Sequence, residues 1–190
     1  MRKVIASEYV SLDGVMGDPG GGDKTRRGGW SFQFWNDEAA KFKFDELFAS
    51  DVLLLGRITY EGFAKAWPGM KDEAGFADRM NGLPKYVVSK TLDVLTWNNS
   101  RLITGDIAEE VTKLKQQPGQ DILLMGSSRL FQTLMQHDLI DVYRLMVHPV
   151  VLGEGKRLFS VESDMKVLRL VDTKRFSSGI LILTYEPVRM

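Results

Sequence analysis

Short, continuous apolar segments recur along this chain, and three of them end in a glycine or a serine. They read DVLLLG at 51–56, KYVVS at 85–89 and DILLMG at 121–126. Apolar runs of this length are typical of strands that are buried on both faces of a sheet. Such sheets are usually parallel and need helical crossovers, so this pattern constrains the chain to an α/β architecture.

Amphipathic segments separate the apolar runs. The expected helices cover residues 36–49, 58–67, 106–117 and 128–137. The expected strands cover residues 4–12, 51–56, 85–89, 101–104, 122–125, 141–148, 167–176 and 180–185. This alternation predicts an α/β/α sandwich with a central mixed, mostly parallel sheet, and the SSG turn at 177–179 predicts a C-terminal antiparallel hairpin. Without a repeat or a linker, residues 1–190 are expected to form a single domain.

Composition excludes several classes of function. The 190 residues carry 25 basic and 25 acidic side chains, which argues against a nucleic-acid partner. The absence of cysteine excludes disulfides and thiolate chemistry and fits a reducing compartment. No run approaches the ~20 apolar residues of a membrane helix, so we expect no membrane partner and a cytoplasmic location. The two histidines lack a carboxylate cluster at ligand spacing, so we expect no metal.

The three apolar strands end in similar chemistry. The residues at these ends are Gly56, Arg57 and Thr59, then Ser89, Lys90 and Thr91, then Gly126, Ser127, Ser128 and Arg129. Ligands of open α/β sheets bind beyond the carboxyl ends of strands, where unpaired helix N–H groups favour an anion. Glycine permits close approach, and lysine or arginine supplies charge. These junctions therefore predict a phosphate group, as part of a nucleotide, although each alone also fits an ordinary helix cap.

The usual nucleotide fingerprints are missing from the sequence. It contains no GxxxxGK[ST] loop, and no GxGxxG stands between a strand and a helix. The glycine-rich loop 14–29 is open to two interpretations, as a mobile surface loop or as a functional one. Trp30 and Trp35 flank this loop, and they form either a wall against a flat heterocyclic substrate or core anchors for the next helix.

These segments resemble the dihydrofolate reductase superfold, and more closely the C-terminal reductase domain of the bifunctional riboflavin-biosynthesis deaminase-reductase. The resemblance covers nearly the whole chain. SLDG at 11–14, LLLGRITYEGF at 53–63, KYVVSKT at 85–91 and ILLMGSSRLFQTLM at 122–135 are similar to motifs of these families. HPVVLGEGKRLF at 148–159 is the most specific, because it resembles the segment that marks the riboflavin-type branch.

The resemblance implies a dihydrofolate reductase-like fold, NADPH as hydride donor and a homodimer. It implies cofactor contacts at Gly56, Arg57, Thr59, Ser89, Lys90, Thr91, Gly126, Ser127, Ser128, Arg129 and Leu130. Positive charge at Arg57 and Lys90 would also favour the 2′-phosphate of NADPH. The implied reaction resembles that of 5-amino-6-(5-phosphoribosylamino)uracil reductase, with hydride transfer to a small heterocyclic or sugar-phosphate substrate. Arg26 and Arg27 are candidates for holding a substrate phosphate.

Two carboxylates are candidates for supplying a proton. Asp13 matches the first-loop motif and alternatively forms an ordinary Asp-Gly turn. Asp37 lies in the first turn of a predicted helix and alternatively serves only as a helix N-terminal charge. The spacing of dihydrofolate reductases places their helix carboxylate at Ala40, which argues against folate reduction. The alternatives are a pterin reductase-like enzyme and a non-catalytic nucleotide-binding protein on the same fold.

Overall fold

The computed structural model describes residues 1–159 and 165–188, and this part of the chain contains one eight-stranded sheet. The strands are β1 (Val4–Ser11), β2 (Ser50–Gly56), β3 (Lys85–Val88), β4 (Ser100–Ile103), β5 (Asp121–Met125), β6 (Val142–His148), β7 (Leu168–Arg175) and β8 (Leu181–Pro187). Their order in space is β4-β3-β2-β5-β1-β6-β8-β7. Strands β4 to β6 in this order are parallel, whereas β8 runs antiparallel to both β6 and β7. The predicted fold class is confirmed.

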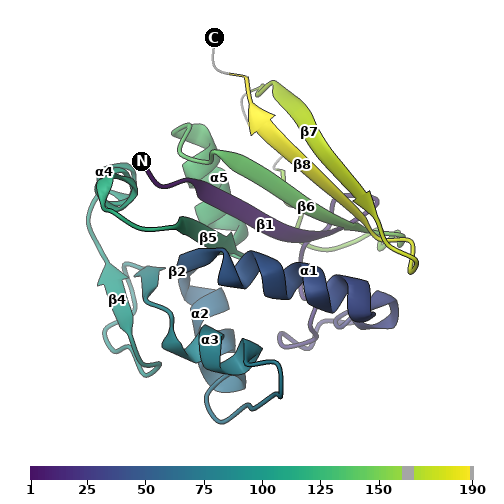
Figure 1. The fold of residues 1–190 in the computed structure, drawn as a ribbon, viewed down its shortest axis with the longest axis horizontal. Helices are drawn as coiled ribbons and strands as arrows, with labels where there is room; N and C mark the ends of the chain where they lie inside the picture. The colour runs from purple at the N-terminus through teal and green to yellow at the C-terminus, as the bar shows by residue number, and fades with distance from the viewer. Residues whose placement is uncertain (160–164, 189–190) are drawn as a thin grey trace.

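Helices cover both faces of the sheet (Figure 1). They are α1 (Asp37–Phe48), α2 (Arg57–Ala66), α3 (Phe76–Gly82), α4 (Ile107–Gln116) and α5 (Ser128–Gln136). Leu53 of β2 belongs to a core cluster with Leu47 of α1, on the side of α1 to α3. Its neighbour Leu54 faces the opposite way and joins Phe131 of α5. The alternation of side chains along buried strands thus distributes the core between two layers.

The register of the parallel strands aligns their carboxyl ends along one side of the sheet, and 'this edge' below means that row of strand ends. Gly56, the last residue of β2, pairs with Val88 at the end of β3. Met125, the last residue of β5, pairs with Ser7 of β1, which continues beyond it alongside β6. The three junctions singled out in the sequence therefore follow neighbouring strands β3, β2 and β5.

The structure adds one helix to those predicted and shows how the glycine-rich loop is held. Helix α3 was not predicted, because its seven residues carry too little apolar periodicity to stand out. The loop after β1 is tied down rather than freely mobile, since Val15 forms an antiparallel bridge with Arg157. The end of the loop adds a 3₁₀ turn at Phe32–Phe34. The helix predicted over 36–49 is confirmed as α1, and Asn36 caps it with its side chain accepting from Ala39 N at 3.0 Å.

A buried polar network anchors α1 to the centre of the sheet. Lys43 Nζ donates to Ser7 Oγ at 2.8 Å and pairs with Glu46, which also accepts from Arg144 at 2.9 Å. Burial alone would raise the pKa of Glu46, but the charges of Lys43 and Arg144 lower it below its usual value. The network fixes α1 against β1 and β6 without leaving a buried charge unpaired.

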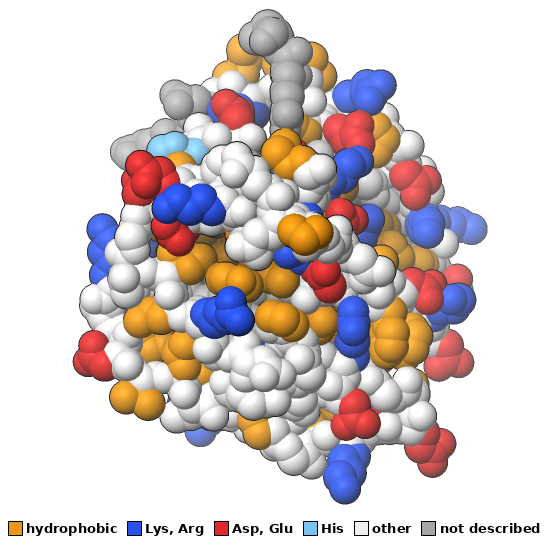
Figure 2. Space-filling view, turned by 60° about the vertical axis from the view of Figure 1, so that its left-hand side comes forward, with side chains coloured by type: hydrophobic (Ala, Val, Ile, Leu, Met, Phe, Trp, Pro, Cys, Tyr) orange, Lys and Arg blue, Asp and Glu red, His pale blue; other side chains and the backbone are white. Residues whose placement is uncertain are grey.

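The exposed surface carries charges of both signs. On the face in Figure 2, which brings the left-hand side of Figure 1 forward, lysine and arginine side chains are interspersed with acidic ones around a central group of apolar side chains. No extended basic patch is visible on this face, in keeping with the zero net charge. Among the described residues, no helix combines the length and the apolar character that a bilayer crossing requires.

Candidate functional site

The turn between β5 and α5 has an uncommon backbone conformation. Gly126 and Ser127 both have positive φ values, of 59° and 63°. Ser127 stands at the N-cap of α5, but its side chain makes no capping hydrogen bond. The first N–H groups of α5 therefore lack the side-chain acceptor that usually satisfies them. An anion placed there would meet both these donors and the positive end of the helix dipole.

The Ser127 hydroxyl instead joins this turn to the one after β2. Ser127 Oγ accepts from the backbone N–H of Gly56 at 2.8 Å and donates to Thr59 Oγ1 at 2.7 Å. A Cβ added to Gly126 would lie 2.9 Å from Thr59 Oγ1, and one added to Gly56 would lie 3.0 Å from Ser127 Oγ. A side chain at either position would crowd the other turn, so the two glycines let the starts of α2 and α5 pack side by side.

The third junction, after β3, is built differently. Ser89 Oγ accepts from the backbone N–H groups of Thr91 at 3.1 Å and Leu92 at 3.0 Å. Residues 89–99 contain no helix, so the expectation of free helix N–H groups at this strand end is wrong. Lys90 is exposed and is therefore available to a ligand at the rim.

Cations and one buried hydroxyl complete this edge. Arg57 and Arg129 are exposed, and Arg57 pairs with Glu61 at 3.1 Å. Ser128 is only 3% exposed, and its hydroxyl has no hydrogen-bond partner among the described residues. Leu130, in the first turn of α5, is 5% exposed and packs into the core, with its Cβ close to the Gly56 turn. The structure thus brings Gly56, Thr59, Ser127 and Ser128 together, with charge at the rim.

Asp13 lies on the other side of β1 and fastens the first loop. Its carboxylate accepts from Ser11 Oγ at 2.6 Å, from Leu152 N at 3.1 Å and from Gly153 N at 2.8 Å. These hydrogen bonds, that from Ser11 above all, hold the pKa of Asp13 far below its usual value. At neutral pH the carboxylate is ionised and has no proton to give. Asp37 is exposed in the first turn of α1 and takes no part in this arrangement.

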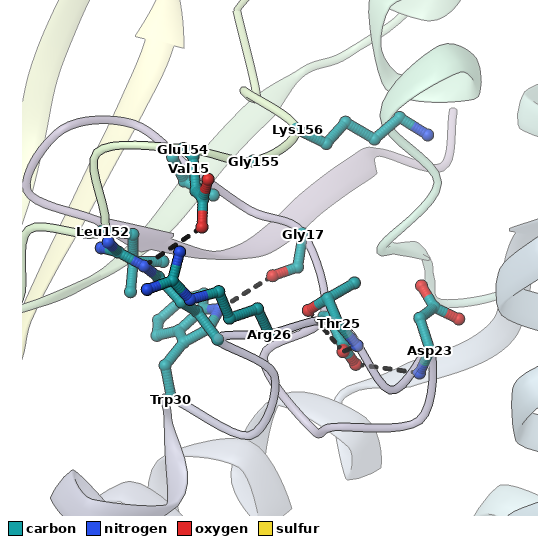
Figure 3. Close-up of a pocket in the computed structure, with 12 residues that line it drawn as sticks. Val15, Gly17, Asp23, Thr25, Arg26, Trp30, Leu152, Glu154, Gly155 and Lys156 are labelled. Carbon is teal, nitrogen blue, oxygen red and sulfur yellow. Dashed lines mark hydrogen bonds and ion pairs between the residues drawn. The ribbon is translucent and has the colours of Figure 1, made fainter.

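A hollow of about 380 Å³ lies between the glycine-rich loop and the segment 152–156 (Figure 3). Arg26 and Arg27 line it, and Arg27 pairs with Glu154 at 3.4 Å. Lys156 extends away from Arg26 and Trp30 in Figure 3, although it belongs to the same lining. The loop is preorganised, because Asp18 accepts from Thr25 N at 2.9 Å and from Thr25 Oγ1 at 2.8 Å.

The two tryptophans have different surroundings. Trp30 is 5% exposed, donates to Gly17 O at 2.8 Å and packs edge-on against His148, with ring centroids 5.0 Å apart. Trp35 is 44% exposed and lies 6.5 Å from the ring of Tyr9. His148 is fully buried, so its pKa is lowered and the ring is neutral at pH 7. Trp30 is thus an anchor of the loop, whereas Trp35 has a free surface for a ligand.

Sequence reasoning did not select the buried carboxyl of Glu8. It is 2% exposed in β1, and burial raises its pKa well above the usual value. The signal was present, because a charged residue interrupts an otherwise apolar strand, VIASEYV. Such an interruption at an inward-facing position indicates a constraint beyond packing.

Comparison with known proteins places this arrangement in a family. The family described as RibD C-terminal domain matches residues 2–182. The uncharacterized protein YyaP of Bacillus subtilis is 38% identical over 188 residues, which are 97% of this chain and 94% of YyaP. The chain therefore belongs to the RibD C-terminal domain family.

Solved structures share the fold. A Shewanella sp. PV-4 protein named for riboflavin biosynthesis has a TM-score of 0.77 at 20% identity, with both chains covered completely. The deaminase/5-amino-6-(5-phosphoribosylamino)uracil reductase of Thermotoga maritima gives 0.65 at 16%, over 98% of this chain and 57% of that chain. Dihydrofolate reductase of Enterococcus faecalis gives 0.57 at 15%, over 97% and 96%. The fold is therefore dihydrofolate reductase-like.

The hydrogen bonds that Asp13 accepts from Ser11, Leu152 and Gly153, called the Asp13 staple below, lead to a prediction about stability. A carboxylate whose pKa is depressed by folding stabilises the native state above its unfolded pKa, about 4, and loses that contribution as pH falls. Asp13→Asn should therefore lower the free energy of unfolding at pH 7, and the difference from the wild type should shrink on acidification. Urea denaturation across this pH range measures both quantities.

Asp23→Asn is the matched control, because Asp23 is an exposed carboxylate of the same loop. It should change stability by less than about 0.5 kcal/mol. An Asp13→Asn protein as stable as the wild type at pH 7 would contradict the role of Asp13 as a staple.

Proposed function

We propose that this chain is an NADPH-dependent reductase. The observation that carries the proposal is the pair of uncapped helix starts joined by Ser127, with the unpartnered Ser128 hydroxyl beside them. A buried hydroxyl without a partner costs free energy unless a ligand or water satisfies it. A diphosphate supplies acceptor oxygens for these donors. Family membership and the reductase fold neighbours support the same conclusion.

The residues present fit the cofactor by their donor chemistry. The N-terminal N–H groups of α5 and the Ser128 hydroxyl would hold the pyrophosphate, with Arg129 supplying charge. Lys90 and Arg57 would hold the 2′-phosphate, which favours NADPH over NADH. When bound, the cofactor supplies the hydride, and the chain's own residues orient it and exclude water.

The substrate side of the proposal lies beyond β1. Trp35 presents an aromatic surface to a flat ring, and Trp30 with the Asp13 staple holds the loop that borders it. Arg26 faces the adjoining hollow and suits an anionic group on the substrate. We assign a small heterocycle, with a sugar phosphate held by the loop, as the substrate class, by similarity to the uracil reductase of T. maritima.

Two alternatives are distinguished by turnover. A pterin reductase needs an acid on α1, but the position expected from dihydrofolate reductases is Ala40. A non-catalytic nucleotide-binding protein would bind NADPH but would not oxidise it, whichever heterocycle is offered. The absence of cysteine and the use of NADPH both fit a cytoplasmic location, which we assign as part of the proposal.

Cofactor binding tests the proposal directly. NADPH should bind the wild type saturably and more tightly than NADH, as measured by tryptophan fluorescence. Arg129→Ala should weaken NADPH binding about tenfold or more, because a charge-assisted contact contributes roughly 1.5–3 kcal/mol. Lys113→Ala is the control, since Lys113 is an exposed cation in the last turn of α4, which leads to the amino end of β5 and not to the three strand ends of the site. Equal losses in both variants, or no saturable binding, would refute the assignment.

The homodimer is a second part of the proposal. Strand β7 forms one edge of the sheet, and nearly all of its residues are exposed. Leu170 and Val171 in it are 48% and 43% exposed. Exposed apolar side chains on an edge strand mark a candidate contact for another chain, although β7 also carries four charged residues that would lie at the border of this contact.

Sedimentation tests the dimer. The wild type should show twice the chain mass of 21.5 kDa. The double substitution Leu170→Lys, Val171→Lys should shift it to the monomer mass, because buried lysines would oppose the contact. Val94→Lys, at a 69% exposed residue outside β7, should leave the dimer intact. A monomeric wild type at micromolar concentration would contradict this part of the proposal.

A further inference from the structure

Glu8 occupies a particular place on β1. The preceding residue, Ser7, pairs with Met125, the last residue of β5, so Glu8 stands where β5 has ended and its turn begins. Its other neighbouring strand is β6, where it pairs with Leu145. The carboxyl group lies against the backbone N–H of Gly126, the first residue of the turn that leads into α5. Glu8 is thus a buried neighbour of the candidate phosphate site.

The environment of Glu8 opposes a negative charge. Only 2% of the residue is exposed, and its Oε1 has no hydrogen-bond partner within the described residues. The ionisable groups that act on it are Lys43 and Glu46 of α1, which are themselves paired with each other. Burial raises the pKa of Glu8 more than Lys43 and the Gly126 N–H lower it, and Glu46 raises it further. The neutral acid is therefore the favoured form over a range that extends well above the usual pKa.

The charge state of Glu8 matters to the turn beside it. An ionised carboxyl against the Gly126 N–H would act as a built-in anion at the start of α5 and would repel a phosphate. A neutral carboxyl leaves the positive end of the helix available and adds an O–H donor. The same turn carries the unpartnered hydroxyl of Ser128, which is 3% exposed. Two buried, unsatisfied polar groups therefore flank a helix start that has no side-chain cap.

We propose that Glu8 is a positioning residue that tunes the phosphate site: as a neutral acid it permits a phosphate-bearing ligand to sit at residues 126–128, and ligand affinity is lost as Glu8 ionises. The identification of the ligand as NADPH rests on the proposed function. The electrostatic effect of Glu8, however, applies to any phosphate at this turn. Glu8 acts through the turn and its N–H groups, so no bond to the reacting atoms is involved.

The sign of the effect follows from proton linkage. If binding requires neutral Glu8, then above its pKa each binding event must take up one proton. Affinity should then fall about tenfold per pH unit above that pKa. Glu8→Gln keeps the size of the side chain and its donor but cannot ionise. The variant should therefore retain its affinity at alkaline pH, where the wild type loses it.

The experiment compares NADPH affinity of the wild type and Glu8→Gln by calorimetry from pH 6.5 to 9.5. Titration of the ligand and of surface lysines is common to both proteins, so the difference between the curves isolates Glu8. Glu186→Gln, at a half-buried carboxylate of β8 that pairs with Arg169, should follow the wild type. Repeating the wild-type titration in two buffers of different ionisation enthalpy measures proton uptake, which should rise toward one at high pH. This second measurement stands even where the variant does not fold.

The outcomes separate the inference from the proposed function. NADPH binding with parallel profiles in both proteins and no proton uptake would overturn the role of Glu8 while leaving the reductase intact. No NADPH binding to the wild type would refute the proposed function, and inorganic pyrophosphate would then replace it as the probe. Pyrophosphate affinity that falls with pH only in the wild type supports the role of Glu8. Absence of pyrophosphate binding, or identical profiles, overturns it.

Discussion

The candidate site depends on one hydroxyl, that of Ser127. By accepting from Gly56 N and donating to Thr59 Oγ1, it joins the starts of two helices that follow neighbouring strands. Because this hydroxyl is directed toward the other turn, it cannot cap its own helix, and the N–H groups of α5 stay available. The positive φ of Ser127 is the conformational cost of this arrangement, whereas Gly126 adopts a positive φ readily. Two glycines make room for it.

The proposed phosphate site and the proposed substrate region lie on opposite sides of β1. Toward β5, the helix starts and the rim cations suit phosphate groups. Toward β6, Asp13 accepts from Leu152 N and Gly153 N and so ties the first loop to that segment, and the ring of Trp35 lies near that of Tyr9. The buried pair Lys43 and Glu46 fixes α1 against β1 beneath both regions. The strand at the centre of the sheet thus carries contacts to each part of the site.

Sequence reasoning reached most of the fold, for identifiable reasons. Continuous apolar runs predicted β2, β3 and β5, and the helices predicted over 36–49 and 106–117 are confirmed as α1 and α4, which Asn36 and Asp106 cap. Helix α3 escaped because it is short and weakly periodic. The glycine and hydroxyl residues at the strand ends were found because their chemistry is local in the sequence. The links from Ser127 to Gly56 and from Asp13 to Leu152 join residues far apart in the chain, so no local pattern reveals them.

For the same reason, the sequence did not reveal which individual carboxylates have a shifted pKa. Asp13 was selected for its motif, yet its proton affinity is set by the Ser11 hydroxyl above all, and then by N–H groups from residues 152 and 153. Glu8 was passed over, although its burial against the Gly126 turn gives it a raised pKa. In both cases the tertiary surroundings, and not the residue type, determine what the group can do.

The most direct test of the account is a crystal structure of the protein grown with NADPH. The account predicts that the pyrophosphate lies at the N–H groups of residues 127–129, with the Ser128 hydroxyl now hydrogen-bonded and the 2′-phosphate near Lys90 and Arg57. A cofactor bound elsewhere, with the edge formed by the ends of β2, β3 and β5 left free, would contradict the central claim.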